Sequence, residues 1–306
     1  MNYSFDTQQK IINLKEQGYS SRSIAALMNI SKSGVNDYYT KYLTNKTKSN
    51  NGPRVLFFDL ETSAALVYCF GRHKQFINQD AIFEEGGKLI CSGYSWLGSD
   101  EVNVLYNADE VKQQKDYTVC KKMWELFNEA DIVVAHNAKG FDVKMLAVRC
   151  LANGLPPLKK VKVIDTLQLA RKGFRFPSNK LDSLGAYLGV GRKVTHSGIS
   201  LWAKVQQGDK QALLKMVEYC KGDVELLKDI FMILQGQGGI NINFGMYYAD
   251  NLTRCKSCGS TNLEFTGKSA LTNTAEFEEI SCLDCGSINR SKVNKLTKNK
   301  RNSLLN

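Results

Sequence analysis

The stretch VLFFDLET, residues 55–62, begins with four apolar residues and then carries two carboxylates, Asp59 and Glu61. Apolar residues on both faces are typical of a central strand that is covered on both sides. Because side chains alternate along a strand, Asp59 and Glu61 point to the same face of the sheet. Two carboxylates at the end of a buried strand are costly unless a cation compensates them, and a metal ion would do so. The alternative is a strand end that has simply reached solvent.

Outward from this strand, strand-like and helix-like segments alternate from about residue 54 to residue 235. Further strands are predicted over residues 88–96, 101–107, 132–135 and 161–165. A short turn separates the first two of these, which predicts an antiparallel hairpin. Helices are predicted over residues 119–130, 140–152 and most of 166–235. The fold class is therefore α/β, with a mixed five-stranded sheet flanked by helices.

Two further acidic residues follow predicted elements of this block. Asp142 lies in the first turn of a helix, where the helix dipole favours a negative charge. Asp223 lies four residues after Tyr219, so both side chains lie on one face of a helix. Each also has an ordinary explanation, as an acid at a helix start and as a solvated Asp beside a half-buried Tyr.

Together, three short motifs resemble the DEDD superfamily of 3′–5′ exonucleases, which includes proofreading domains of DNA polymerases and RNA-trimming enzymes. The motifs are DLET at residues 59–62, NAKGFD at 137–142 and YCKGD at 219–223. Tyr219 in place of His resembles the DEDDy branch, and Tyr-Cys-x-x-Asp resembles the proofreading domain of family B DNA polymerases. The resemblance covers about residues 54–235 and implies a ribonuclease-H-like fold.

The resemblance implies a catalytic set of Asp59, Glu61, Asp142, Tyr219 and Asp223. Oxygen ligands without organised His or Cys favour Mg²⁺ or Mn²⁺, and the family binds two such ions. Asp59 would bridge the ions, Glu61 and Asp223 would complete one shell, and Asp142 would hold the second ion. The ions would activate a water and stabilise the leaving 3′-oxygen, and Tyr219 would orient that water.

The resemblance also implies contacts with the substrate strand. The backbone around Leu60 and Thr62 would meet the terminal nucleotide, and Asn137 and Phe141 would line the cleft. Residues 139–193 hold twelve Lys/Arg and three acidic residues, and this stretch would contact phosphates. Within it, basic and Phe side chains alternate over residues 171–176, which suits a single strand, although the Phe residues could equally be core. His136 and His196 are either bases or structural residues.

Near the C-terminus two Cys-x-x-Cys pairs, Cys255/Cys258 and Cys282/Cys285, are each followed by Gly-Ser. This near-repeat resembles a zinc ribbon, in which four thiolates close a structural Zn²⁺ site. Two disulfides are the alternative, which a reducing compartment disfavours. The other five cysteines, at positions 69, 91, 120, 150 and 220, show no spacing pattern and are predicted to be buried. We expect a zinc ribbon over residues 250–290 and a basic tail over 291–306.

At the N-terminus, residues 1–46 resemble a helix-turn-helix DNA-binding module. Helices are predicted over residues 5–17, 21–28 and 32–43, the last as the recognition helix. Lys32, Ser33 and Asn36 near its start are the candidates for DNA contact. Any small three-helix bundle could show the same pattern. The polar segment that follows, residues 44–53, reads as a linker.

Charge supports a polyanionic partner. The net charge is +11; residues 1–50 hold seven basic and three acidic residues, and residues 286–306 hold six basic residues and no acid. Concentration of positive charge at both ends and in residues 139–193 favours nucleic acid over a generally basic surface. No run of eighteen apolar residues and no secretory signal is evident, so we expect a cytoplasmic protein without a membrane span.

These observations predict a two-metal-dependent 3′–5′ exonuclease that hydrolyses DNA, at single-stranded 3′ ends, to nucleoside 5′-monophosphates. It would require two Mg²⁺ or Mn²⁺ and one structural Zn²⁺. The helix-turn-helix favours DNA over RNA, and a replication or recombination protein is a possible partner. Two alternatives stay open: an RNA 3′-trimming exoribonuclease, and a DNA-binding recombination or regulatory factor with a vestigial nuclease site. The abundance of Asn and Lys would suit a phage with an AT-rich genome.

Overall fold

The computed structural model describes residues 5–47, 52–71, 73, 76–237 and 239–305, and it divides into two compact units. One unit comprises Met1–Pro53 with Phe244–Thr253, and the other comprises Arg54–Asn243 with Arg254–Asn306. Among the described residues, no helix combines the length and the apolar character needed to cross a membrane.

The first unit contains three helices, α1 (Phe5–Glu16), α2 (Ser21–Met28) and α3 (Lys32–Thr47), and a 3₁₀ turn, η2 (Phe244–Tyr247). A small core of Ile11, Ile24 and Val35 takes one residue from each helix. The three predicted helices are present, and the third runs four residues further than expected.

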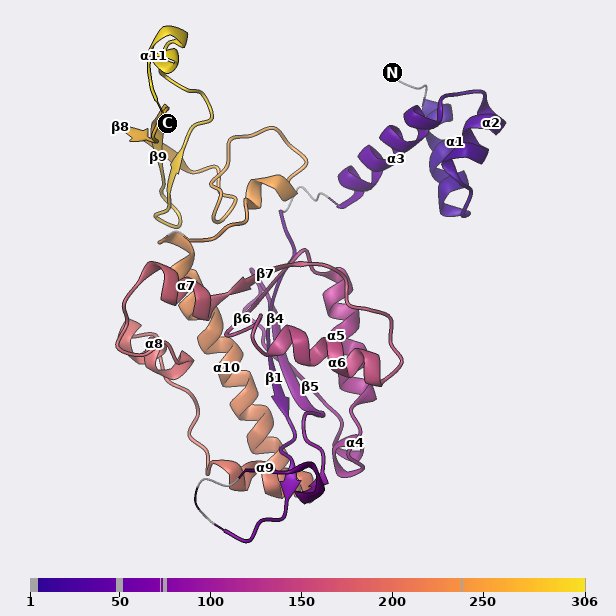
Figure 1. Ribbon diagram of the computed structural model, residues 1–306, viewed down its shortest axis with the longest axis vertical. Helices are drawn as coiled ribbons and strands as arrows, with labels where there is room; N and C mark the ends of the chain where they lie inside the picture. Colours follow the sequence, from indigo (N-terminus) through magenta and orange to yellow (C-terminus); the bar gives the residue numbers. More distant parts are fainter. Residues whose placement is uncertain (1–4, 48–51, 72, 74–75, 238, 306) are drawn as a thin grey trace. The chain divides into compact units, whose positions relative to one another are not determined.

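The second unit contains a five-stranded mixed sheet in the order β5-β4-β1-β6-β7 (Figure 1). Its strands are β1 (Val55–Thr62), β4 (Leu89–Trp96), β5 (Asn103–Tyr106), β6 (Ile132–Ala135) and β7 (Lys162–Asp165). Strand β1 pairs antiparallel with β4 and parallel with β6. The predicted mixed five-stranded α/β sheet is therefore confirmed.

Helices cover both faces of this sheet. Figure 1 shows α5 and α6 on one face and the long α10 on the other, with α7 and α8 beside α10. The helices of this unit are α4 (Ala108–Lys112), α5 (Tyr117–Glu129), α6 (Asp142–Ala152), α7 (Thr166–Gly173), α8 (Leu181–Leu188), α9 (Ile199–Gln206), α10 (Lys210–Gly236) and the short α11 (Lys298–Asn302).

Alternation along β1 assigns its side chains to the two faces. Leu56, Phe58 and Leu60 belong to the core that packs on α5 and α6, and the Phe58 ring lies 5.1 Å from that of Phe127. On the opposite face the Phe57 ring lies 5.2 Å from that of Phe231 in α10. Because period-two alternation continues along the strand, Asp59 and Glu61 share the α10 face with Phe57.

Gly93 of β4 lets α10 approach the sheet closely. It pairs with Asp59 across the two strands. A Cβ at this position would lie 2.8 Å from Cγ2 of Val224 and 3.0 Å from the carbonyl oxygen of Cys220. The Gly93 amide also donates to the Cys220 sulfur at 3.0 Å. The missing side chain thus holds the middle of α10 against the carboxylate end of β1.

An insertion between β1 and β4 was not predicted. Its described part forms η1 (Gln79–Ala81) and a two-stranded ribbon of β2 (Leu66–Val67) and β3 (Ile82–Glu84). Cys69 lies in this insertion and is exposed, so the prediction that it would be buried is wrong. The other four cysteines without a spacing pattern are buried as predicted: Cys91, Cys120, Cys150 and Cys220.

The C-terminal segment forms a second, three-stranded sheet. Strand β9 (Glu276–Cys282) is central and pairs antiparallel with β8 (Leu263–Leu271) and β10 (Ile288–Arg290). The two Cys-x-x-Cys pairs lie in turns at one end of this sheet. The residues expected to form only a basic tail include the one-turn helix α11.

Candidate functional site

Three carboxylates meet where β1 faces α10. Oxygen atoms of Asp59, Glu61 and Asp223 all lie within 4.8 Å of one another. Asp223 and Glu61 are almost completely buried, and Asp59 is half-buried. This convergence follows from alternation along β1 and from the close packing of α10 at Gly93. Two acidic groups of one strand and a third that is distant in sequence therefore share one small volume.

Asp142 lies next to this group. It begins α6, so it lies in the first turn of a helix as predicted, and it is 3% exposed. Backbone amides, among them that of Leu60 in β1, donate hydrogen bonds to its carboxylate. The negative charge of Asp142 also raises the pKa of Asp59. Asp142 thus completes a set of four acidic residues, although its oxygens lie outside the tight group of three.

The crowding makes ionisation of these groups unfavourable. Burial, followed by the charges of Asp142, Glu61 and Asp223, raises the pKa of Asp59 well above its ordinary value. Burial and then Asp223 raise the pKa of Glu61 to about 8. Burial raises the pKa of Asp142 to about 7. Additional positive charge in the site would therefore be strongly stabilising.

Lys193 supplies a cation from the loop after α8. Its Nζ donates to Oδ2 of Asp223 at 2.5 Å and to the hydroxyl of Tyr219 at 2.8 Å. Burial opposes its charge, but Asp223 raises the pKa of Lys193 above its ordinary value. One lysine offsets only part of the negative charge of four carboxylates.

The donor set fits a divalent metal. Within the described part of the chain, Oδ1 of Asp223 is buried and has no hydrogen-bond partner. A buried carboxylate oxygen without a partner costs free energy that a bound cation would recover. All the ligand atoms are oxygens, which is the preference of Mg²⁺ and Mn²⁺. Asp59, Glu61, Asp142 and Asp223 are the residues that could hold such ions.

The loop before Asp142 is fixed by Asp165 at the end of β7. Its carboxylate, 4% exposed, accepts from the amides of Asn137 and Lys139 at 3.0 and 3.1 Å. It also caps α7 by accepting from Leu167 and Gln168. Asp165 therefore positions the loop that leads to Asp142.

A strained residue shapes the same loop. Asn137 has φ of +70°, which is uncommon for a residue other than Gly. Gly140 makes room for it, because a Cβ on Gly140 would lie 2.3 Å from Oδ1 of Asn137. The loop therefore depends on Gly140 as well as on Asp165.

The two candidate histidines have structural partners. The ring nitrogens of His136 bond to the carbonyl of Asn179 and to the hydroxyl of Thr166, both at 2.9 Å. Because a carbonyl only accepts, Nε2 carries the proton and Nδ1 accepts from Thr166. His196 accepts from the Gly198 amide and packs its ring 4.8 Å from that of Tyr219. These contacts favour the structural interpretation of both residues.

The predicted substrate residues have different environments. Asn137 and Phe141 are exposed beside the site. Thr62 is half-buried at the end of β1. The Leu60 side chain points into the opposite core, so only its backbone faces the carboxylates. Lys32, Ser33 and Asn36 are exposed at the start of α3, in the other compact unit.

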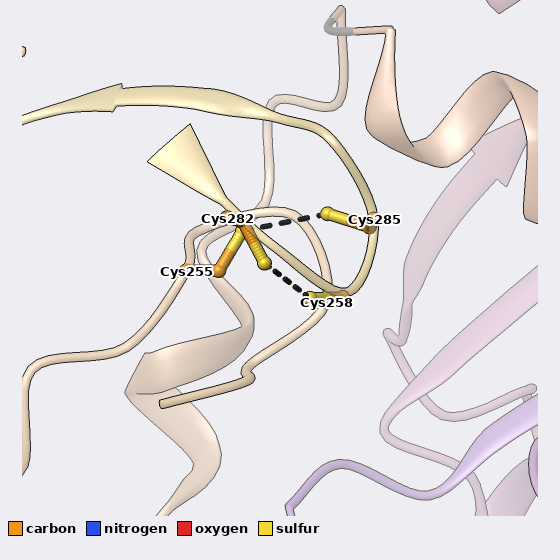
Figure 2. A group of neighbouring side chains, drawn as sticks. All are labelled: Cys255, Cys258, Cys282 and Cys285. Atoms are coloured by element: carbon orange, nitrogen blue, oxygen red, sulfur yellow. Dashed lines mark hydrogen bonds between the residues drawn. The ribbon is translucent and has the colours of Figure 1, made fainter. Parts of the chain in front are cut away.

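The four C-terminal cysteines form a second candidate metal site. Figure 2 shows their side chains converging, and the sulfurs of Cys255 and Cys285 are 3.7 Å apart while those of Cys258 and Cys282 are 3.6 Å apart. Four thiolates about 2.3 Å from a tetrahedral Zn²⁺ would be about 3.8 Å from one another. The spacing therefore fits a metal site of four sulfur ligands.

Backbone and side-chain donors surround these sulfurs. The Ser257 amide donates to the Cys255 sulfur at 3.4 Å, and the Asn289 side-chain amide donates at 3.5 Å. Although burial opposes ionisation, hydrogen bonds from the amides of Cys258 and Ser257 and from Asn289 lower the pKa of Cys255 to about 7. The site thus favours at least one thiolate, which is the form that binds metal.

Sequence reasoning did not single out two residues of the carboxylate site. Lys193 counted only as one of twelve basic residues, and no motif marked it. Asp165 was predicted as the end of a strand. An Asp that directly precedes a helix is recognisable in sequence as a helix cap. The hydrogen bonds that Asp165 accepts from the loop at Asn137, nearly thirty residues earlier, are not recognisable in this way.

No match was found among curated proteins. Among solved structures, the chain is similar to a family B DNA polymerase from the hyperthermophilic archaeon Pyrobaculum calidifontis, with a TM-score of 0.43 and 15% identity. That similarity covers 60% of this chain and 25% of the polymerase, so the chain spans about a quarter of that protein's length.

A family model for the RNase H superfamily matches residues 76–235. The matched residues include Asp142, Tyr219 and Asp223, whereas Asp59 and Glu61 precede them. The match extends over more than half of the chain and contains four of the five strands of the sheet, together with α10. This chain belongs to the RNase H superfamily.

Proposed function

We propose that the chain is a metal-dependent 3′–5′ exonuclease that hydrolyses single-stranded DNA ends to nucleoside 5′-monophosphates. The observation that carries the proposal is the convergence of Asp59, Glu61 and Asp223 within 4.8 Å, with Asp142 beside them. RNase H-like nucleases use divalent metals, and membership of that superfamily suggests a hydrolase acting on nucleic acids. Four mutually repelling carboxylates are costly to retain unless they bind cations.

Each residue has a role that its surroundings support. Asp59, Glu61, Asp142 and Asp223 would bind two Mg²⁺ or Mn²⁺ ions, and the single unsatisfied oxygen of Asp223 is one ligand atom for them. When bound, such ions supply Lewis-acid stabilisation of charge on the phosphate and lower the pKa of water.

Tyr219 would orient the attacking water through its hydroxyl. That hydroxyl already accepts a hydrogen bond from Lys193, so its own proton is directed away from the ammonium group. Burial raises the pKa of Tyr219 above its ordinary value, so the phenol stays protonated and can donate. Lys193 would shift between Asp223 and the negatively charged phosphate of the substrate.

The flanking segments extend the proposal. The four cysteines would bind one structural Zn²⁺, since their spacing fits a tetrahedral thiolate site. The start of α3 would contact DNA through Lys32, Ser33 and Asn36, all of which are exposed. These two modules would hold the substrate while the carboxylate site shortens it, in the company of a replication or recombination protein.

The proposal is tested by incubating the full chain with a 5′-labelled single-stranded DNA and with the RNA of the same sequence. The arms contain Mg²⁺, Mn²⁺ or EDTA, and the comparison protein is Asp142→Asn. We expect a metal-dependent ladder that shortens from the 3′ end of DNA, and loss of about a thousandfold or more in the variant, because several kcal/mol of transition-state stabilisation are removed.

Other outcomes select the alternatives. Faster shortening of the RNA would make the chain an RNA-trimming enzyme. Binding of DNA by both proteins without shortening by either, under every metal, would overturn the nuclease proposal and leave a binding factor with a vestigial site.

A further inference from the structure

Beside the carboxylates lies a cavity of about 530 Å³. It is bordered by the loop after β6, by α7, by the start of α8 and by Lys193, the residue that also contacts Asp223. The cavity therefore adjoins the carboxylate site, with Lys193 as a shared wall. Its other charged lining residues are Arg171, Lys180 and Asp182.

The border of this cavity is strongly basic. Residues 166–193 contain six Lys/Arg and a single acidic residue, Asp182. The carboxylate of Asp182 is occupied, because it accepts from Arg192 at 3.2 Å and from the Lys193 amide at 2.9 Å. Among the described residues, neither Arg171 nor Lys180 forms an ion pair, and both are exposed. Two uncompensated cations thus face the cavity that leads to the catalytic acids.

An aromatic cluster continues from the same elements. Phe174 directly follows α7, and its ring centroid lies 5.2 Å from that of Phe176. Phe176 in turn lies 5.4 Å from Tyr187 of α8, which is 66% exposed. The mostly exposed ring of Tyr187 packs against Phe176, which itself packs against Phe174, so it offers a supported surface on which a flat group can stack. Single-stranded nucleic acid binds surfaces that combine cations and exposed aromatic rings. The cations contact its phosphates, and the rings stack on its bases.

We infer that the α7–α8 face is the binding track for the single strand upstream of the scissile phosphate. Arg171 and Lys180 bind successive phosphates of that strand, and Tyr187 stacks on a base. The inference rests on the proposed function, because it assigns the substrate of that site as a flexible single strand of several nucleotides. A base-paired strand could not present a base face to Tyr187, so the track selects unpaired 3′ ends.

The test measures equilibrium binding, so it does not depend on hydrolysis. A fluorescently labelled 12-nucleotide DNA strand is titrated with the full chain in EDTA, and polarisation is followed at several salt concentrations. The double variant Arg171→Ala/Lys180→Ala should bind about tenfold more weakly. Its log–log salt slope should be smaller by about 1.4, since each phosphate contact contributes about 0.7 for a single strand. Tyr187→Ala should bind about tenfold more weakly with an unchanged salt slope, because one stacked base is lost.

Matched control variants distinguish the loss of contacts on the α7–α8 face from a general loss of positive charge. Lys121→Ala/Lys204→Ala removes the same charge from exposed positions that do not line the cavity, and its affinity should stay within about twofold of wild type. Arg171→Lys/Lys180→Arg keeps both positive charges and should bind with an affinity close to that of wild type, which ties the loss in the double alanine variant to those charges.

The outcomes are distinguishable from those of the exonuclease test. If the control pair weakens binding as much as Arg171→Ala/Lys180→Ala, or if neither changes it, the track is overturned even when hydrolysis occurs. If the track variants bind weakly as expected but no metal supports strand shortening, the track stands and the exonuclease proposal fails.

Discussion

The two candidate metal sites of this chain are built in opposite ways. The four cysteines lie within 31 residues of one another in sequence, in two turns at one end of a small sheet. The four carboxylates come from β1, α6 and α10 and span 165 residues. The carboxylates are carried by a domain with its own large apolar core, whereas the cysteine segment contributes few buried apolar side chains.

This difference predicts different consequences of losing the metal. A segment with almost no core depends on its metal for folding, because binding free energy is then folding free energy. A site mounted on a packed sheet stays folded without metal and loses mainly its chemistry. The cysteine site should therefore control structure, and the carboxylate site should control activity.

The largest expected effect is unfolding of the cysteine segment, residues 254–290, when zinc is removed. A thiol-competing chelator should unfold residues 254–290 and leave the five-stranded sheet intact, because structural Zn²⁺ contributes about 10–16 kcal/mol in small metal domains. Elemental analysis should find one zinc per chain. Limited proteolysis, followed by mass spectrometry, should show new cleavage only in the cysteine segment. Cys258→Ser should behave like the chelated protein, and Cys69→Ser, at an exposed cysteine outside the site, should not. If the cysteine segment stays protease-resistant without metal, the two candidate metal sites do not differ in their importance for folding.

A buried carboxylate outside both candidate metal sites, Asp116, sharpens the comparison, because it has its own cation. Asp116 is 1% exposed and accepts from Nε and Nη2 of Arg149 at 2.6 and 2.8 Å, from Asn153 at 2.9 Å and from the Leu89 amide at 2.8 Å. Although burial opposes ionisation, these hydrogen bonds lower the pKa of Asp116 below its ordinary value. The protein thus compensates Asp116 internally and leaves the carboxylates of the candidate metal site largely uncompensated.

The change Asp116→Asn should cost about 3 kcal/mol of unfolding free energy at pH 7, because it leaves Arg149 half-buried without a counter-ion. A carboxyl group with a lowered pKa in the folded state stabilises the protein above its ordinary pKa, near 3.8, and loses that contribution as pH falls further. Denaturant unfolding at several pH values should therefore show the difference between wild type and variant shrinking below about pH 4. A difference that is constant with pH would mean that the Asp116 charge contributes nothing.

Lys193 is the cation that contacts Asp223 in the carboxylate site, and its replacement should have the next largest effect. Lys193→Met should lower the rate of strand shortening by about 10- to 100-fold, since the positive charge next to Tyr219 and Asp223 is lost. The same variant should need less Mg²⁺ for half-maximal rate, because the ammonium group competes with metal for Asp223. A purely structural role would lower the rate without changing the Mg²⁺ requirement, and Lys193→Arg would then rescue it.

The sequence predicted much of this arrangement because its signals are local or periodic. Alternation in residues 55–62 assigned Asp59 and Glu61 to one face, and the five strands of a mixed sheet followed from strand and helix spacing. The cysteine pairs were predicted by their spacing alone. In each case the pattern directly reflects the geometry of one element.

What the sequence did not predict depends on contacts between distant segments. Gly93 carries no motif, yet it permits the approach of α10 that brings Asp223 to Asp59. Lys193 belongs to a loop whose position is fixed only after α8 packs on α10. The insertion with β2 and β3 has short strands of two and three residues, too short for an alternating pattern to be visible. Tertiary packing, rather than local preference, determines all three.

The smallest effect concerns metal and pH at the carboxylate site. In the absence of metal, the pKa values of Glu61 and Asp142 are raised to about 8 and about 7. Between their ordinary values, 4.5 and 3.8, and these raised values, the folded chain holds protons that the unfolded chain has released. The stability of the metal-free protein therefore falls as pH rises from about 4.5 to 8.

Bound Mg²⁺ removes this penalty, so 10 mM Mg²⁺ should raise Tm by about 5 °C at pH 8.5 and by about 1 °C at pH 5.5. Asp223→Asn, with one charge fewer, should have the higher metal-free Tm at pH 8.5 and a smaller response to Mg²⁺. Equal shifts at both pH values would show that the carboxylates ionise freely without metal, and the contrast between an uncompensated cluster and the compensated Asp116 would not hold.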